Sequence, residues 1–261
     1  MLTAWRRWRR RRVLRRGLLD SRIWQPVLRQ QPLLAALSEP QRQRLRELAT
    51  LFLAEKQFLG AAGFEPQPRQ AATVAALACL PVLELGFDWY DGWHSVILYP
   101  SGFLARHRFQ DEHGLEHEWA GELSGEAWEG GPVVLSWPDV QQSTALDGYN
   151  VVLHEMAHKL DMRNGDPNGF PPLPPGMSRQ RWSGAFHNAY RHLEAQEAAG
   201  RDDLLDPYAL ENPGEFFAVA AEAFFELPAA LRDDYPEVYR QLREFFGQDP
   251  AARGAVDGRQ Q

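Results

Sequence analysis

Apolar residues recur at the three- and four-residue spacing of amphipathic helices through most of the chain. Ser38 is expected to cap the first long helix, because Pro40 and Gln41 follow it in the first turn. The next segment is rich in alanine, and small side chains favour a closely packed, buried helix. The predicted helices are short segments within 18–38 interrupted by Pro26 and Pro32, followed by 38–57, 69–80, 151–160, 182–197, 212–226 and 236–246.

Shorter segments have the composition of β-strands. Segments 95–99 and 131–137 are rich in β-branched and aromatic residues, and a proline directly follows each of them. Segments 103–110 and 115–119 are expected to pair as a hairpin around 111–114. The segment 131–137 is expected to present a sheet edge to which an extended substrate could pair.

Charge is distributed unevenly along the 261 residues. The net charge is −7, yet residues 1–16 contain eight of the 28 basic residues and no acidic one. We expect 1–17 to be a basic, disordered, solvated tail, 18–248 to be a single domain and 249–261 to be a second disordered tail. Binding of nucleic acid or anionic lipid by the arginine run is the alternative.

The sequence offers no sign of export or membrane insertion. No apolar run approaches the length needed to span a bilayer, and the segment after the arginine run is interrupted by charges. Cys79 is the one cysteine, which excludes an intrachain disulfide and fits a reducing compartment. The expectation is a cytoplasmic protein.

One of the apolar helices carries an unusual polar trio. His154 and His158 are four residues apart and therefore lie on one helical face, and Glu155 directly follows the first. This H-E-x-x-H arrangement is typical of zinc peptidases, in which the imidazoles bind the metal and the glutamate reaches a water on it. The alternative is a helix whose histidines are satisfied in the core. Asp147 or Asn150 is expected to cap its start.

A catalytic zinc usually has three protein ligands, so a further ligand is required. Asp161 and Asn164 stand where the extended H-E-x-x-H-x-x-G-x-x-H motif has glycine and histidine, which excludes that class. Glu215 and Glu222 interrupt the apolar helix 212–226 on nearly one face. Glu215 fits zinc ligation and an N-terminal capping box equally well. Glu222 is also a ligand candidate, or it could accept a hydrogen bond from a histidine N–H. Asp161 could likewise accept from a histidine N–H, and the alternative for Asp161 is a solvated helix end.

A second histidine pattern is a weaker candidate. His113, Glu116 and His117 match the inverted motif H-x-x-E-H, which requires a helix. Gly114 and the strand-like alternation around it predict a turn instead. No metal site is expected there.

Several sequence blocks together resemble the bacterial Mlc titration factor A family of zinc peptidases. They run through most of residues 20–246 and are far more specific than H-E-x-x-H alone. The catalytic core of this family is similar to the C-terminal domain of anthrax lethal factor. That toxin combines H-E-x-x-H with a later Glu-Phe-Phe-Ala helix and a tyrosine seven residues before its glutamate. The matching blocks here are 52–56, 78–83, 89–93, 125–128, 131–137, 154–162 and 212–217.

The resemblance implies an α+β fold: a mainly helical, zincin-like metallopeptidase domain with a small β-sheet beside the H-E-x-x-H helix. It implies that His154, His158 and Glu215 bind Zn²⁺ and that Glu155 is the catalytic base. It also makes Tyr208, seven residues before Glu215, the donor that stabilises the transition state.

The resemblance further implies aminopeptidase-like activity on short peptides and, in enteric bacteria, binding of the glucose repressor Mlc. Our first hypothesis is zinc-dependent hydrolysis of a peptide or protein substrate. The second is a regulatory protein that sequesters a transcription factor, with incidental peptidase activity or none. A third is nucleic-acid binding through the arginine run, which the acidic remainder of the chain disfavours. Neither a nucleic acid nor a membrane is expected as a partner.

Overall fold

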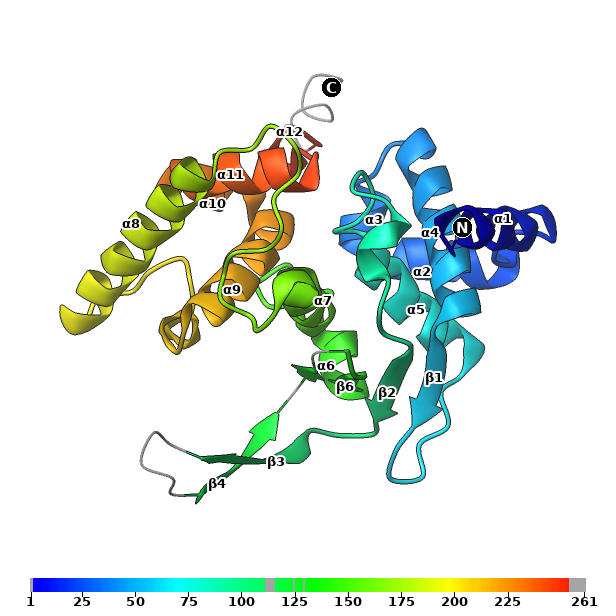
Figure 1. Ribbon diagram of the computed structural model, residues 1–261, viewed down its shortest axis with the longest axis horizontal. Coiled ribbons are helices and arrows are strands. Elements are labelled where there is room, and N and C mark those ends of the chain that lie inside the picture. Colours follow the sequence, from blue (N-terminus) through cyan, green and yellow to red (C-terminus); the bar gives the residue numbers. More distant parts are fainter. Residues whose placement is uncertain (1, 111–115, 124, 129, 254–261) are drawn as a thin grey trace.

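The computed structural model describes residues 2–110, 116–123, 125–128 and 130–253. It is mostly helical, with a small sheet next to the central helix, so the predicted α+β fold is confirmed (Figure 1). The α-helices are α1 (Leu2–Arg15), α2 (Ser21–Gln30), α3 (Pro32–Ala35), α4 (Glu39–Glu55), α5 (Pro68–Cys79), α6 (Trp137–Gln142), α7 (Val151–Asp161), α8 (Arg179–Ala198), α9 (Pro213–Glu226), α10 (Pro228–Asp234), α11 (Pro236–Phe246) and α12 (Pro250–Arg253). The short 3-10 helices are η1 (Phe87–Tyr90), η2 (Met162–Asn164) and η3 (Pro207–Leu210).

Four short strands form the main sheet in the order β1-β2-β6-β5. Strands β1, β2 and β6 are parallel, with Phe58 opposite Val96 and Val96 opposite Val133, whereas β5 is antiparallel to β6. Their bounds are β1 Gln57–Gly60, β2 Ser95–Tyr99, β5 Gly125–Ala127 and β6 Val133–Ser136.

The prediction that 131–137 forms a sheet edge is wrong. Strand β6 within this segment has a hydrogen-bonded neighbour on each side, β2 and β5. The edge next to β6 is formed instead by β5, which has three residues and is too short to give an alternating sequence pattern.

A separate hairpin extends away from the sheet (Figure 1). It pairs β3 (Phe103–Gln110) with β4 (Glu116–Leu123) in antiparallel register, as predicted. His113 lies outside the described residues. Glu116 and His117 belong to a strand, so this part of the H-x-x-E-H pattern lacks the helix that the motif needs.

Helix α7 lies between two groups of helices, with α1 to α5 on one side and α8 to α11 on the other (Figure 1). On the first side, Phe52 packs edge-on against Tyr90 and Trp93, with ring centroids 6.1 and 5.7 Å apart. On the other side, Trp182 contacts Phe217 and Phe245 at 5.8 and 5.4 Å. Packed aromatic rings therefore form part of the core on both sides of α7.

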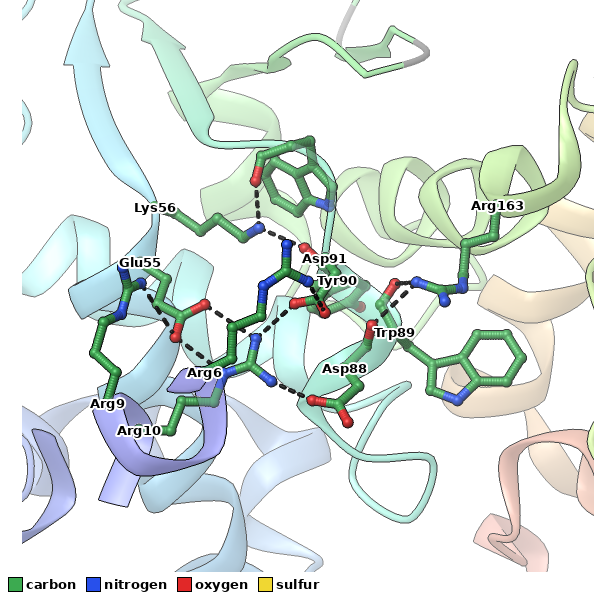
Figure 2. A network of polar contacts seen from close by, with 11 residues as sticks. Arg6, Arg9, Arg10, Glu55, Lys56, Asp88, Trp89, Tyr90, Asp91 and Arg163 are labelled. Atoms are coloured by element: carbon green, nitrogen blue, oxygen red, sulfur yellow. Dashed lines mark hydrogen bonds and ion pairs between the residues drawn. The ribbon is translucent and has the colours of Figure 1, made fainter. Parts of the chain in front are cut away.

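The N-terminal segment that the sequence predicts to be a tail is helical over Leu2–Arg15, and the C-terminal segment is described as far as Arg253. The arginine run forms helix α1, because Arg10 forms ion pairs with carboxylates of the body while Val13 and Leu14 pack on the core (Figure 2). At the other end, helix α12 directly follows Asp249. Residues 254–261 lie outside the described residues.

Within the described part of the chain, no helix has both the length and the hydrophobicity needed to cross a bilayer.

Candidate active site

Helices α7 and α9 bring together three side chains that could hold a metal ion. His154 and His158 project from one face of α7, and Glu215 lies in the first turn of α9. Oε2 of Glu215 is 3.0 Å from Nε2 of His154 and 3.2 Å from Nε2 of His158, and the two Nε2 atoms are 3.1 Å apart. The candidate ligand atoms of all three residues lie within 4.8 Å of one another. The structure thus joins two segments that are far apart in the sequence.

The main chain and the side chain of Glu215 have different partners in the structure. Its backbone N–H donates to Oδ1 of Asn212 at 3.0 Å, so Asn212 does cap α9. The Glu215 carboxylate, however, points toward His154 and His158. Capping therefore involves the main chain of Glu215, and its side chain remains available to a metal.

Glu222 fixes the orientation of His154. Its Oε1 lies 2.7 Å from Nδ1 of His154, which leaves Nε2 directed at Glu215. Its other oxygen accepts from the backbone N–H of Asn150, and Nδ2 of Asn150 donates to Glu226 at 2.9 Å. Asn150, not Asp147, caps α7 by accepting from Leu153. The same contacts that orient the histidine therefore also join α7 to α9.

Asp161 has neither of the roles considered from the sequence. It is fully buried, and its Oδ2 accepts from the backbone N–H of Gly169 at 2.6 Å. It is thus neither a solvated helix end nor a carboxylate that holds a histidine. Its contact attaches the loop after α7 to the helix, and burial raises the pKa of Asp161.

The electrostatics of the three converging side chains favour a cation between them. Burial by itself would lower the pKa of His154, but Glu222 and Glu215 raise it well above its ordinary value. Burial would raise the pKa of Glu215, and the two histidines outweigh it and lower that pKa below its ordinary range. A set of two imidazoles and one carboxylate is a common donor set for a catalytic divalent metal, so these residues fit one.

Glu155 lies beside this group without joining it. Its side chain is buried, and Oε2 has no hydrogen-bond partner among the described residues. Burial raises the pKa of Glu155 to about 7. Gly125 of β5 approaches so closely that a Cβ there would lie 2.5 Å from Oε1 of Glu155. A glycine is therefore needed for the edge strand to pass over this carboxylate.

Tyr208 reaches the same place from η3. Its ring centroid is 6.1 Å from that of His154, and 47% of the residue is exposed. Asp206 positions η3 by accepting from the backbone N–H of Tyr208 at 2.8 Å. Partial burial, together with Glu215 and neighbouring carboxylates, raises the pKa of Tyr208, so the phenol remains a proton donor at neutral pH.

A cavity of about 560 Å³ opens onto these side chains. His154, Glu155 and Tyr208 line it, as does Gly125 of the edge strand. The volume is within the range of sites that bind small ligands or a few residues of a peptide.

Lys159 supports the structure around the site, and the sequence analysis missed it. Its Nζ donates to the backbone oxygens of Trp128 and of Gly131, the latter at 2.9 Å, and lies 5.1 Å from the centre of the Trp93 ring. It thereby fastens the turn between β5 and β6 to α7. The available signal was a lysine on the apolar side of a helix, next to His158.

Comparison with known proteins agrees with this geometry. The family described as "Glucose-regulated metallo-peptidase M90" matches residues 5–247. Proteins named "Mlc titration factor A" from Yersinia pestis (strain Pestoides F) and from Yersinia pseudotuberculosis serotype O:1b (strain IP 31758) are each 43% identical over 225 residues. These matches cover 85% of this chain and 83% of each relative. The family expected from the sequence blocks is confirmed: this chain belongs to the M90 family of glucose-regulated metallopeptidases.

Proposed function

We propose that this protein is a zinc-dependent peptidase with aminopeptidase-like activity. The observation that carries the proposal is the convergence of His154, His158 and Glu215, with Glu155 buried beside them. Zinc accepts two imidazoles and a carboxylate while keeping a position open for chemistry. When bound, the metal supplies Lewis-acid chemistry that polarises a carbonyl and acidifies a water.

The side chains of the protein divide the remaining chemistry. Oε2 of Glu155 accepts no hydrogen bond from the residues that the structure describes, and burial brings the pKa of Glu155 near neutrality. Glu155 can therefore take a proton from the attacking water and deliver it to the leaving amine. A divalent metal held by the neighbouring side chains would lower this pKa and would favour the ionised carboxylate of Glu155. The protonated phenol of Tyr208 can donate to the oxyanion that forms at the scissile carbonyl.

The cavity supports a short substrate with a free amino terminus. Strand β5 offers the outer edge of the sheet, to which an extended peptide can add its own backbone hydrogen bonds. Carboxylates at the cavity wall include those of Glu197, Asp202 and Asp206, alongside the guanidinium of Arg201. A predominantly acidic wall attracts the α-ammonium group of a peptide.

Replacement of Glu155 by glutamine tests the proposal. Glu155→Gln keeps the shape of the side chain but cannot accept the proton, so kcat for hydrolysis of an aminoacyl p-nitroanilide should fall about 10²–10⁴-fold. The zinc content should remain that of the wild type. Glu244→Gln on the exposed face of α11 is the matched control and should leave kcat unchanged. Full activity of Glu155→Gln would remove this residue from the mechanism.

Repressor binding is a second candidate function, favoured by the name of the relatives, "Mlc titration factor A". Isothermal titration with purified Mlc tests it. If repressor binding is independent of catalysis, the wild type and Glu155→Gln should bind Mlc with equal affinity. An absence of heat with both proteins would reject this second function and leave the peptidase proposal untouched.

A further inference from the structure

We propose that the outward face of α1 binds the surface of an anionic lipid membrane. This function is separate from the peptidase site and rests on a different part of the molecule. Helix α1 lies at the periphery, on the opposite side of the N-terminal helices from α7 (Figure 1).

The inward face of α1 is attached to the body of the protein. Arg10 is buried, donates to Glu55 at 2.9 Å and to Asp91 at 2.6 Å, and also pairs with Asp88 (Figure 2). Its guanidinium lies 4.8 Å from the centre of the Phe87 ring. Arg6 adds a pair with Asp91 at 2.6 Å. The helix is therefore held in one orientation, which presents its other face to the outside.

That outward face combines aromatic and cationic side chains. Trp5 and Trp8 are each 55% exposed, among the most exposed large apolar residues that the structure describes. The guanidinium of Arg12 lies 5.6 Å from the centre of the Trp8 ring. Five arginines in 2–16 form no ion pair with a carboxylate of the described residues. They are Arg7, Arg11, Arg12, Arg15 and Arg16.

This combination fits a lipid surface better than a nucleic acid. Tryptophan favours the interface between lipid headgroups and acyl chains, and arginine pairs with lipid phosphates. Base stacking needs free ring faces, but the guanidinium of Arg9 covers one face of Trp5, and that of Arg12 covers one face of Trp8. The rest of the chain is acidic and would repel a nucleic acid that wraps around it. A membrane is nearly flat on this scale and would contact α1 without approaching the acidic remainder.

Vesicle co-sedimentation of the full chain tests the proposal. The protein should sediment with vesicles of phosphatidylcholine mixed with phosphatidylglycerol, should not sediment with phosphatidylcholine alone, and should be released by salt. Combining Arg11→Glu with Arg12→Glu should weaken binding by more than about tenfold. Trp5→Ala with Trp8→Ala should also weaken it, because the indoles insert at the interface.

Matched controls separate this face from general charge and exposure. Two control variants replace exposed residues outside α1: Arg29→Glu in α2 and Trp128→Ala, where Trp128 is 52% exposed. Both should bind vesicles as the wild type does. Thermal unfolding should show that each α1 variant remains folded. Equal binding to both vesicle types, unchanged binding of the α1 variants, or α1-dependent binding of an oligonucleotide without vesicle binding would each overturn the proposal.

Discussion

At the scale of single residues, Tyr208 brings a phenol to the cavity that His154 and Glu155 also line. Its phenol is half-exposed and protonated at neutral pH, while His154 and Glu155 are held in place by helix α7. A donor placed in this way acts on the charge that forms in the transition state, and a metal ligand acts on binding of the metal. The two kinds of residue can therefore be separated by experiment.

Tyr208→Phe removes only the hydroxyl. Loss of one oxyanion donor typically lowers kcat about 10²–10³-fold, and we expect a loss of this size with KM and zinc content little changed. Steady-state kinetics with metal analysis of the same samples measures all three. A variant with the kcat of the wild type would show that the hydroxyl does not contact the oxyanion.

Residue spacing predicts part of this site and is silent on the rest. The positions of His154 and His158 follow from a four-residue period that any helix would satisfy. The role of Glu215 could not be decided from the local sequence, because an acidic residue in the first turn of a helix is suited to capping as well as to metal ligation. Tyr208 has no local signal at all, and only the similarity to a known family indicated it. Distances between helices, which decide both cases, depend on packing throughout the domain.

At the scale of elements, side chains of α7 contact both the edge strand β5 and the turn that follows it. Lys159 contacts two carbonyls of the β5–β6 turn, while Gly125 of β5 rests against Glu155. Lys56 is a structural counterpart that donates to the carbonyls of Tyr90 and Trp93, both at 2.6 Å. The two lysines thus fasten different turns.

Comparing Lys159→Met with Lys56→Met tests whether the β5–β6 turn matters for substrate. Each change leaves two carbonyls without their donor, and these are buried at Lys56 but only partly buried at Lys159. Lys56→Met should therefore lower the free energy of unfolding by about 1–3 kcal/mol, and Lys159→Met by less. Only Lys159→Met should raise KM for a peptide, because only this variant loosens the strand that borders the cavity. Denaturant unfolding and peptide kinetics measure the two effects. Equal KM values in the two variants would contradict the assignment.

Element boundaries were most predictable where capping residues and periodicity agree. Ser38 starts α4 and Asn212 starts α9, as their sequence positions indicate. Strands β1 and β5 were missed, because four and three residues are too few to establish a period of two. The edge position given to 131–137 failed for the same reason, since an unrecognised strand occupies it.

At the scale of the whole molecule, helix α1 is part of the folded structure. The eight arginines of residues 1–16 are alike in sequence, and nothing local marks Arg10 as the one that is buried. Its selection depends on Glu55 and Asp91, which the fold brings within 3 Å. A charged segment that looks like a solvated tail can therefore be ordered by carboxylates far away in the sequence.

Arg10→Met should destabilise the protein, and Arg12→Met should not. Removing Arg10 takes the buried cation from Glu55, Asp88 and Asp91, and loss of hydrogen bonds to a charged group typically lowers the free energy of unfolding by about 1.5–3 kcal/mol. Glu55 keeps its pair with Arg9, and Asp91 keeps its pair with Arg6. Partial exposure of Asp88 and Asp91 keeps the loss below that of a fully buried pair. Denaturant unfolding compares the two variants. Equal stability would show that α1 is not attached through Arg10.

The account as a whole depends on one metal ion held between α7 and α9. Zinc content per chain should therefore be measured by plasma mass spectrometry for the wild type, Glu215→Ala, Glu222→Ala and Glu155→Gln. We expect about one zinc in the wild type and in Glu155→Gln, none in Glu215→Ala, and an affinity lowered about 10–100-fold in Glu222→Ala. Full zinc content in Glu215→Ala, or its loss in Glu222→Ala alone, would contradict the proposed metal site.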